Sequence, residues 1–321
     1  MVRGRSPLPP TKQIVTLAGG VGAAKFIRGL VRRIVPQRLT VVVNTGDDET
    51  FYGLHVSPDL DTVTYTLANL VNHQQGWGRV DESFTTLGEL ARFYGRPWFA
   101  LGDRDFATHL YRTERLRAGA RLSEVTHDIA RALGLKSQVL PMSDDPLRTF
   151  VKIRGRRALP FQEYFVRGRA RGAVERIELR GAKHARPLPA ALRALRTAAA
   201  TILAPSNPFV SLGPILALAG VRPTLARSRG RVAAISPIVG GRTLKGPADK
   251  MLRGLGMAVS PVSVARLYRD IAGIFVLDNT DRGYAGSIEK LEMRAVVTDT
   301  IMTTPSRAAR LAEVVLRALE V

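Results

Sequence analysis

Short apolar runs rich in valine, isoleucine and leucine recur along the chain, and most of them lead into a turn and then a helical pattern. The runs span residues 13–18, 38–45, 200–205, 231–236, 273–279 and 294–300. Strands that alternate with helices build parallel sheets, and strands that are apolar throughout belong to sheets covered on both faces. The sequence therefore predicts a Rossmann-like three-layer α/β/α fold with a mostly parallel sheet.

Residues 66–195 interrupt this alternation. Four helical patterns come first, and strand-like segments follow at 137–141, 149–154 and 174–180. We expect this region to be an inserted smaller α/β region that caps the carboxyl ends of the sheet, while residues 13–65 and 196–321 form the Rossmann-like core. Residues 1–12 contain two Arg and three Pro but no apolar stretch, so we predict a disordered tail and no signal peptide.

The chain is strongly basic, with 48 Lys and Arg against 27 Asp and Glu, a formal net charge of +21. A nucleic-acid binder is one explanation, but no helix-turn-helix, zinc finger or RNA-binding motif accompanies the charge. The excess is concentrated in residues 151–200, where thirteen basic residues face three acidic ones. We favour a solvated basic surface, which also suits an anionic small substrate, and expect no nucleic-acid partner.

Two absences exclude further classes of protein. The sequence contains no cysteine, which excludes a disulfide framework and a thiolate nucleophile or metal site. The longest apolar stretch, residues 209–221, is interrupted by Gly and Pro and is too short to span a bilayer. We therefore expect a soluble, cytoplasmic protein without a membrane partner.

A glycine-rich turn follows the first predicted strand, at the edge of the sheet where open parallel sheets bind ligands. Gly19, Gly20 and Gly22 allow the backbone to approach an anion closely, and the next predicted helix, which carries Lys25, begins with free N–H groups. The turn lacks the Lys-Ser/Thr pair of a Walker A loop and the third Gly of the dinucleotide fingerprint. We interpret it as another kind of phosphate loop; a turn without a ligand is the alternative.

Acidic residues follow the second predicted strand and precede the next helix. Asp47 and Asp48 lie in the segment 44–49, and Asp59 and Asp61 lie two residues apart shortly after it. Carboxylates without a nearby His or Cys cluster favour Mg²⁺ over zinc, and phosphoryl transfer needs both a metal and a base for the attacking hydroxyl. Solvated turns and helix capping are the alternatives.

Polar side chains also follow later strands. Ser206 and Asn207 come after the run at 200–205 and offer a hydroxyl and an amide to a nucleotide, with helix capping as the alternative. In the inserted region, Arg104 is placed to hold a phosphate, with a surface ion pair as the alternative. The five His residues show no metal-binding spacing, and we interpret His109 as structural, with a place in a pocket as the alternative.

Taken in order, these segments resemble one family. The motifs are GGVGAAKF, VVVNTGDDE, SPDLDTVTYTLA, GWG, DESF, LGDRDFATHL, LPMSDDP, APSNPFVSLGPIL, SPIVGG, GPADK and DTIM. They closely resemble the 2-phospho-L-lactate transferase family of coenzyme F420 biosynthesis. The similarity runs from about residue 15 to the end of the chain; each motif alone is weak, but the ordered set is specific.

The resemblance implies a reaction. Family members transfer a phospho-acid group from a guanosine diphosphate donor to the terminal ribityl hydroxyl of the deazaflavin Fo (7,8-didemethyl-8-hydroxy-5-deazariboflavin). GMP leaves, and F420-0 or its dehydro form is produced. Mg²⁺ is required, and a homodimer is usual. The three-carbon acid is lactyl, enolpyruvyl or glyceryl, and no motif in this sequence distinguishes among them.

Site residues carried over from the family are expectations. Asp61 and Asp48 are implied as catalytic residues, and Asp47, Asp48 and Asp61 as metal ligands. The glycine loop, Lys25, Ser206 and Asn207 are implied to bind the donor, and Asp61 to contact Fo. Ala100 stands at a family position that can be basic, so either that Fo contact is absent or Arg104 replaces it. We also expect an Asp61→Asn protein to stay folded and lose turnover.

A related family of gluconeogenesis factors supplies the alternative function. Its members bind UDP-sugars without catalysis and share the glycine-rich start. Their second strand ends in a longer Asp-Gly-Gly-Ser-Ser loop, which the segment NTGDDETFYG lacks. The sequence therefore favours the transferase.

Overall fold

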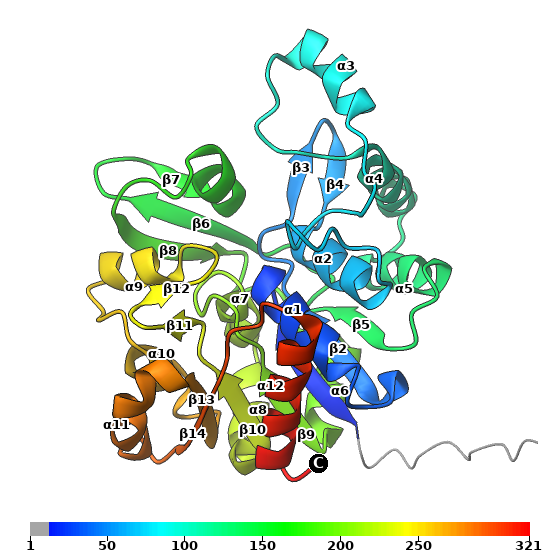
Figure 1. The fold of residues 1–321 in the computed structure, drawn as a ribbon. Helices are drawn as coiled ribbons and strands as arrows, with labels where there is room; N and C mark the ends of the chain where they lie inside the picture. Colours follow the sequence, from blue (N-terminus) through cyan, green and yellow to red (C-terminus); the bar gives the residue numbers. More distant parts are fainter. Residues whose placement is uncertain (1–12) are drawn as a thin grey trace, which may run out of the picture.

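The computed structural model describes residues 13–321, so the predicted tail at residues 1–12 lies outside the described residues. A central sheet of seven strands, all paired in parallel, has the order β14-β13-β10-β9-β1-β2-β5 (Figure 1). The strands are β1 (Ile14–Ala18), β2 (Leu39–Val43), β5 (Gln138–Pro141), β9 (Ala200–Leu203), β10 (Val232–Ile235), β13 (Ile274–Asp278) and β14 (Arg294–Thr298). The predicted Rossmann-like α/β fold is confirmed.

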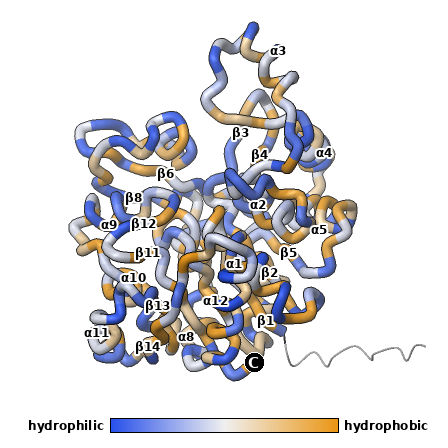
Figure 2. Tube along the Cα trace, in the orientation of Figure 1, coloured by the Kyte–Doolittle hydropathy of each residue, from blue (hydrophilic) through white to orange (hydrophobic). Residues whose placement is uncertain are grey.

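The strands are buried on both faces because helices cover the sheet from two sides. Along β1, Ile14 and Ala18 pack into one core, whereas Val15 and Leu17 pack into the other. The first core contains side chains of α1 (Gly20–Leu30), α2 (Pro58–Leu67), α5 (Leu122–Ala132) and α12 (Pro305–Ala318). The second contains side chains of α6 (Pro189–Thr197), α7 (Leu212–Ala217), α8 (Val221–Arg227) and α10 (Pro261–Tyr268). Hydrophobic segments accordingly run through the sheet, and hydrophilic ones lie mostly on outer loops (Figure 2).

Helices α1 and α12 lie side by side although they stand at opposite ends of the chain (Figure 1). A Cβ atom at Gly29 would lie only 2.3 Å from the carbonyl group of Ala308. The two backbones therefore approach so closely that only glycine fits at this point of α1.

The region predicted as an insertion is divided between the sheet and the periphery. Strand β5, within the range 66–195, pairs with β2 and forms an edge of the central sheet. The interpretation of segment 137–141 as part of a separate unit was therefore wrong. A short apolar run does not reveal which sheet it joins, because pairing is a tertiary choice.

The peripheral elements stand above the carboxyl ends of the strands (Figure 1). They are the hairpin β3 (Glu49–Phe51) and β4 (Leu54–Val56), helices α3 (Thr85–Tyr94) and α4 (Asp103–Arg117), and an antiparallel sheet of β7 (Ala158–Pro160), β6 (Arg148–Ile153) and β8 (Val174–Arg180) with the π-helical turn η3 (Glu163–Arg167). The hairpin β11 (Ile238–Val239) and β12 (Arg242–Thr243) and helix α9 (Ala248–Gly254) lie on the same side as β8, and α11 (Ala285–Glu289) lies lower.

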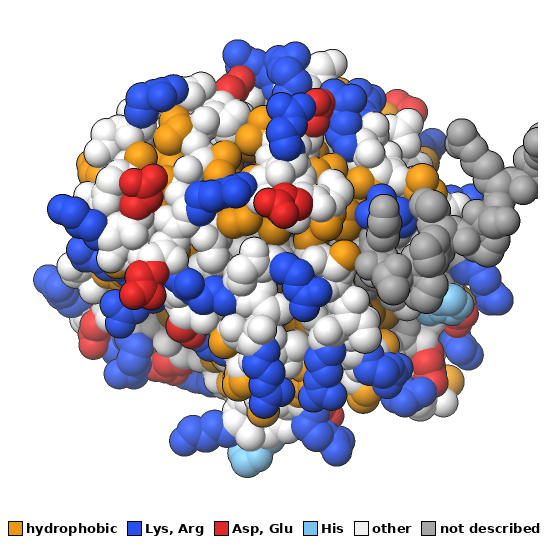
Figure 3. All heavy atoms as spheres, turned by 90° about the horizontal axis from the view of Figure 1, so that it is seen from below, with side chains coloured by type: hydrophobic (Ala, Val, Ile, Leu, Met, Phe, Trp, Pro, Cys, Tyr) orange, Lys and Arg blue, Asp and Glu red, His pale blue; other side chains and the backbone are white. Residues whose placement is uncertain are grey.

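The opposite end of the molecule carries many basic side chains. Seen from below, Lys and Arg are spread over this face among neutral and hydrophobic atoms and do not form one stripe (Figure 3). This distribution is typical of a solvated surface. Within the described range, no helix is both long and apolar enough to cross a membrane.

Candidate active site

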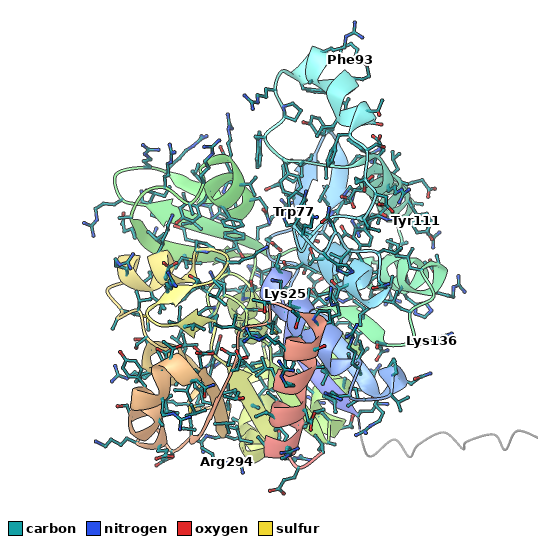
Figure 4. All side chains as sticks on the ribbon, in the orientation of Figure 1. Lys25, Trp77, Phe93, Tyr111, Lys136 and Arg294 are labelled. Carbon is teal, nitrogen blue, oxygen red and sulfur yellow. The ribbon has the colours of Figure 1, made fainter. Side chains whose placement is uncertain are left out.

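A cavity of about 800 Å³ opens at the carboxyl ends of the strands. Its walls come from the glycine loop, from α2, from the peripheral elements and from the loops after β9, β10 and β14. Lys25 and Trp77 both line the cavity. In Figure 4 they lie near the centre of the molecule, below the gap between the β6–β8 sheet and the β3–β4 hairpin. The place of the cavity agrees with the rule that open α/β sheets bind ligands at this edge.

The glycine loop is packed against two other predicted loops. A Cβ at Gly19 would lie 2.7 Å from Oδ2 of Asp59, and one at Gly22 would lie 2.3 Å from the carbonyl oxygen of Pro205. Gly20, the first residue of α1, has a φ of +71°, a conformation that favours glycine. Gly19, Gly20 and Gly22 all line the cavity. The loop is therefore shaped by its neighbours to expose backbone at the start of a helix.

Ser206 and Asn207 also line the cavity. The Ser206 hydroxyl donates to the carbonyl oxygen of Gly19 at 2.8 Å and so ties the loop after β9 to the glycine loop. The Asn207 side-chain oxygen accepts from the backbone N–H of Phe209 at 2.9 Å and shapes the turn that follows. Both residues lie at the predicted site, although part of their hydrogen-bonding capacity is used within the protein.

Two aspartates share one amide at the floor of the cavity. The Asn44 side-chain N–H group donates to Asp47 at 3.1 Å and to Asp59 at 2.9 Å. Gln162 donates to the other oxygen of Asp47 at 2.8 Å. Both aspartates are buried and line the cavity. The sequence placed Asp59 near the site but did not select it as a ligand.

The surroundings of Asp47 and Asp59 favour their protonated forms. Burial raises the pKa of Asp59 to about 7, against the opposing hydrogen bond from Asn44. Burial, followed by the charges of Asp59 and Asp48, raises the pKa of Asp47 well above its usual range. Two close carboxylates in a buried site are stabilised when a cation neutralises them.

Asp48 is directed elsewhere. Its Oδ2 accepts from the Ser57 hydroxyl at 2.8 Å and lies 3.0 Å from Nε2 of His55. Burial raises its pKa, against the opposing effect of His55. Asp48 is not among the residues that line the cavity, and its Oδ1 is buried without a hydrogen-bond partner among the described residues. The structure therefore places Asp48 behind the predicted metal site.

Asp61 is held by an ion pair that was not predicted from the sequence. Arg112 of α4 donates from Nη1 to Oδ2 of Asp61 at 3.1 Å and from Nη2 to Oδ1. His109 lies beside this pair, with Nδ1 at 3.7 Å from Oδ2 of Asp61. Asp61 and His109 line the cavity, while Arg112 is 2% exposed behind them. Asp105, His109 and Arg112 are spaced so that they share one face of α4. This spacing is the sequence feature from which the buried polar face of α4 could have been predicted.

A basic side of the cavity is formed by Lys25 and Lys245, both of which line it. Burial, then the charges of Lys245 and Arg28, lowers the pKa of Lys25. Lys25 has no acidic partner within the described part of the chain, and Lys245 donates to the carbonyl oxygen of Gln75 at 2.9 Å. Lysines without acidic partners in a cleft favour an anionic ligand. No motif in the sequence marks Lys245 as a site residue.

Arg104, predicted to contact Fo, is exposed and does not line the cavity. Its guanidinium group donates to the carbonyl oxygen of Val80 at 3.1 Å. Ala100, by contrast, does line the cavity. Arg104 therefore does not replace the basic residue that other family members can have at the position of Ala100.

Aromatic side chains line the cavity on two sides. Trp98 and Phe99 come from the loop before α4, and Phe99 stacks on Phe51 with ring centroids 4.2 Å apart. Phe161 and Phe165, on the side of the β6–β8 sheet, stack at 5.5 Å. Flat apolar walls of this kind suit an aromatic ligand.

No group of three or more His, Asp and Glu side chains in residues 13–321 is placed to hold a metal ion by itself. The predicted set of Asp47, Asp48 and Asp61 is not gathered in one place, because Asp48 is bound behind the site and Asp61 is paired with Arg112. The chemistry of Asp47 and Asp59 nevertheless fits Mg²⁺, which is commonly held by one or two carboxylates together with substrate phosphates and water.

Comparison with known proteins identifies the family of the chain. The family described as "2-phospho-L-lactate transferase CofD" matches residues 14–312. The chain belongs to this family. The family resemblance that the motifs predicted is thereby confirmed.

Relatives in the CofD family cover almost the whole chain. A phosphoenolpyruvate transferase of Kitasatospora aureofaciens is 41% identical over 314 residues, covering 96% of this chain and 98% of the relative. A 2-phospho-L-lactate transferase of Methanosarcina mazei is 35% identical over 305 residues, covering 95% and 100%. Both are named as transferases, and this CofD-family protein is a transferase.

Solved structures support the same architecture. A Bacillus halodurans protein described as a member of the UPF0052 family aligns with a TM-score of 0.61 at 15% identity, covering 95% of this chain and 98% of that one. At this identity the similarity concerns the fold alone.

Proposed function

We propose that this protein transfers a phospho-acid group from a guanosine diphosphate donor to the terminal ribityl hydroxyl of Fo, with Mg²⁺ bound. One observation carries the proposal. A single cavity joins the glycine loop, two buried carboxylates and aromatic walls, which are the parts that a diphosphate, a metal ion and a deazaflavin ring require. The relatives named above support the same reaction class.

The donor occupies the glycine loop in this proposal. Backbone N–H groups at the start of α1 and the charges of Lys25 and Lys245 bind the diphosphate, while Ser206 and Asn207 keep the neighbouring loop in place. Asp47 and Asp59 hold Mg²⁺, which neutralises charge on the phosphate oxygens when bound.

The acceptor lies between the aromatic walls. Its hydroxyl oxygen forms a new bond to the transferred phosphorus, the bond from that phosphorus to the GMP oxygen breaks, and the hydroxyl proton is lost. Of the two carboxylates predicted to take this proton, Asp61 lines the cavity, whereas Asp48 lies behind it and accepts a hydrogen bond from Ser57. Because Arg112 already balances the charge of Asp61, the geometry favours a role for Asp61 in positioning the acceptor.

We propose enolpyruvyl as the acid of the donor. Six relatives at 39–45% identity are named phosphoenolpyruvate transferases, whereas two at 35–36% are named 2-phospho-L-lactate transferases. A cytoplasmic location and a homodimer rest on the family resemblance, and light scattering of the purified protein tests the homodimer.

The decisive experiment supplies the protein with Fo, Mg²⁺ and each of the three guanylylated acids, and weighs the products by mass spectrometry. We expect GMP and dehydro-F420-0 from the enolpyruvyl donor. GDP should also raise the melting temperature more than UDP does, since a ligand that binds the folded state stabilises it. Stabilisation by UDP-sugars together with no consumption of Fo would instead support the gluconeogenesis-factor function.

A further inference from the structure

Asp105 is a buried aspartate that faces the cavity and that the reaction described above does not use. It is 7% exposed and lines the cavity from the first turn of α4. Its Oδ1 is buried and has no hydrogen-bond partner within the described residues. A buried polar atom left without a partner destabilises the fold, so its place beside the cavity indicates a ligand group.

The charges around Asp105 make its burial more costly. Asp61 of α2 and Glu82, in the segment before α3, are both close enough for their charges to raise the pKa of Asp105, after burial itself, to about 7. Tyr65 of α2 and the backbone at Gly102 act in the opposite direction through hydrogen bonds. No basic side chain is among the main influences on this carboxyl group. The described residues form no salt bridge with Asp105, so hydrogen bonds alone offset its burial.

His109 lies one turn further along α4, on the same face, and also lines the cavity. Burial lowers its pKa to about 4, so the imidazole is neutral near pH 7. Its Nδ1 lies 3.2 Å from Nη1 of Arg112. An arginine only donates, so Nδ1 accepts and the proton of the neutral ring is on Nε2. Arg112 thus fixes His109 as a hydrogen-bond donor through Nε2.

Asp105 and His109 together offer an acceptor and a donor beside an aromatic wall. The loop that precedes α4 supplies Trp98 and Phe99 to the same cavity. A molecule that matches this arrangement has a flat aromatic ring and, attached to it, a chain with hydroxyl groups. Hydroxyls both donate and accept, so one chain can satisfy both side chains.

We propose that Asp105 and His109 form the subsite for the hydroxyl groups of the acceptor's ribityl chain. Asp105 accepts a hydrogen bond from one hydroxyl, and Nε2–H of His109 donates to another. The inference rests on the proposed function and assigns this part of the cavity to the acceptor rather than to the nucleotide donor.

The test is equilibrium binding of Fo and of GDP to the full-length protein, with wild type, Asp105→Asn and Asp105→Ser compared. At pH 8, above the folded-state pKa of Asp105, the carboxyl group is ionised, and we expect the dissociation constant for Fo to rise about tenfold or more in both variants, as for a lost hydrogen bond to a charged group. The GDP constant should change less than about twofold, and the melting temperature should not fall, because an uncompensated buried carboxyl has been removed. The control is Asp128→Asn on α5, whose partly exposed carboxylate pairs with Arg115 and Arg131 and does not line the cavity.

The outcomes separate the inference from the proposed function. If wild type consumes Fo while both Asp105 variants bind it as tightly as wild type, the inference is overturned and the proposed function stands. Equal losses of Fo and GDP affinity, with a lower melting temperature, would show a structural role and also overturn it. Wild type that neither binds nor consumes Fo would overturn both.

Discussion

Arg112 donates through both terminal nitrogens to the two carboxylate oxygens of Asp61, and both side chains are buried. The pair connects α4 to α2 and leaves Asp61 facing the cavity with its charge already balanced. Asp61 is therefore part of the framework of the site, whichever contact it makes with the acceptor.

The pair changes what we expect from Asp61→Asn. The sequence suggested that this variant would keep its stability, because Asn caps helices as well as Asp. The structure shows that Asp61 makes no capping bond and that its removal leaves Arg112 as a buried, uncompensated charge. We expect the free energy of unfolding to fall by about 3–5 kcal/mol, measured by urea denaturation, together with a loss of turnover.

The double variant Asp61→Asn/Arg112→Gln provides the control. It removes both charges, so it should recover a large part of the stability that either single variant loses. Turnover measured in the double variant then reports on the loss of both charges without the stability loss of the single variants. Single variants as stable as wild type would contradict the importance of the pair.

A second prediction concerns the two aspartates that share the Asn44 amide. In Asp47→Asn/Asp59→Asn, the repulsion between two buried carboxyl groups is removed, so the metal-free protein should melt at a higher temperature than wild type. Mg²⁺ should stabilise wild type, by about 2.7 kcal/mol at a hundred times its dissociation constant, and should not stabilise the variant. Scanning calorimetry with EDTA or Mg²⁺ measures both effects.

Activity supplies the second readout for this pair. Excess EDTA should abolish consumption of Fo by wild type, and Mg²⁺ should restore it. Turnover of the double variant should fall by on the order of a hundredfold or more. Asp270→Asn, at an exposed ion pair with Arg222, serves as the control. Full wild-type activity in EDTA would refute the metal role.

Much of the site could be predicted because its parts follow strand ends. The turns after β1, β2 and β9 lie at one edge of a parallel sheet, so Gly19, Asp47 and Ser206 had to converge once the strands were recognised. The apolar character of these strands was sufficient for the fold class. Local sequence patterns were therefore sufficient to predict both the layered architecture and the edge of the sheet where we propose that phosphate binds.

The remaining parts depended on orientation and on distant contacts. Asp59 and Asp61 are two residues apart on α2, a rotation of about 200°, so they face opposite directions: Asp59 faces the glycine loop and Asp61 faces α4. Which one reaches the phosphate side depends on the packing of the helix. Lys245 and the pairing of β5 with the central sheet were missed for the same reason, since their partners lie far away in the sequence.

A third prediction concerns the basic side of the cavity. Lys25→Met and Lys245→Met keep most of each side chain's apolar length and remove its charge. Each should weaken GDP binding by about tenfold, the scale of a hydrogen bond to a charged group, and should reduce the salt dependence of binding. Isothermal titration calorimetry at two salt concentrations measures both. Lys136→Met is the control, since Lys136 is exposed on the outer side of the molecule (Figure 4); equal losses there would indicate only a general charge effect.

The last prediction concerns pH and Asp105. Burial, with the charges of Asp61 and Glu82, raises its folded-state pKa to about 7, well above the 3.8 of an ordinary Asp. Between these two values the folded protein keeps the proton and the unfolded chain releases it. Stability therefore falls as the pH rises through this window, by at most about 1.4 kcal/mol per pH unit for this one group.

Asp105→Asn has no such proton to lose. Its free energy of unfolding should fall less steeply than that of wild type between pH 5 and about pH 7, and above pH 7 it should exceed wild type by on the order of a few kcal/mol. Urea denaturation across this range measures the difference, in which the contributions of Asp47 and Asp59 cancel because both proteins contain them. Parallel profiles would mean that Asp105 titrates normally and is not confined as the structure describes.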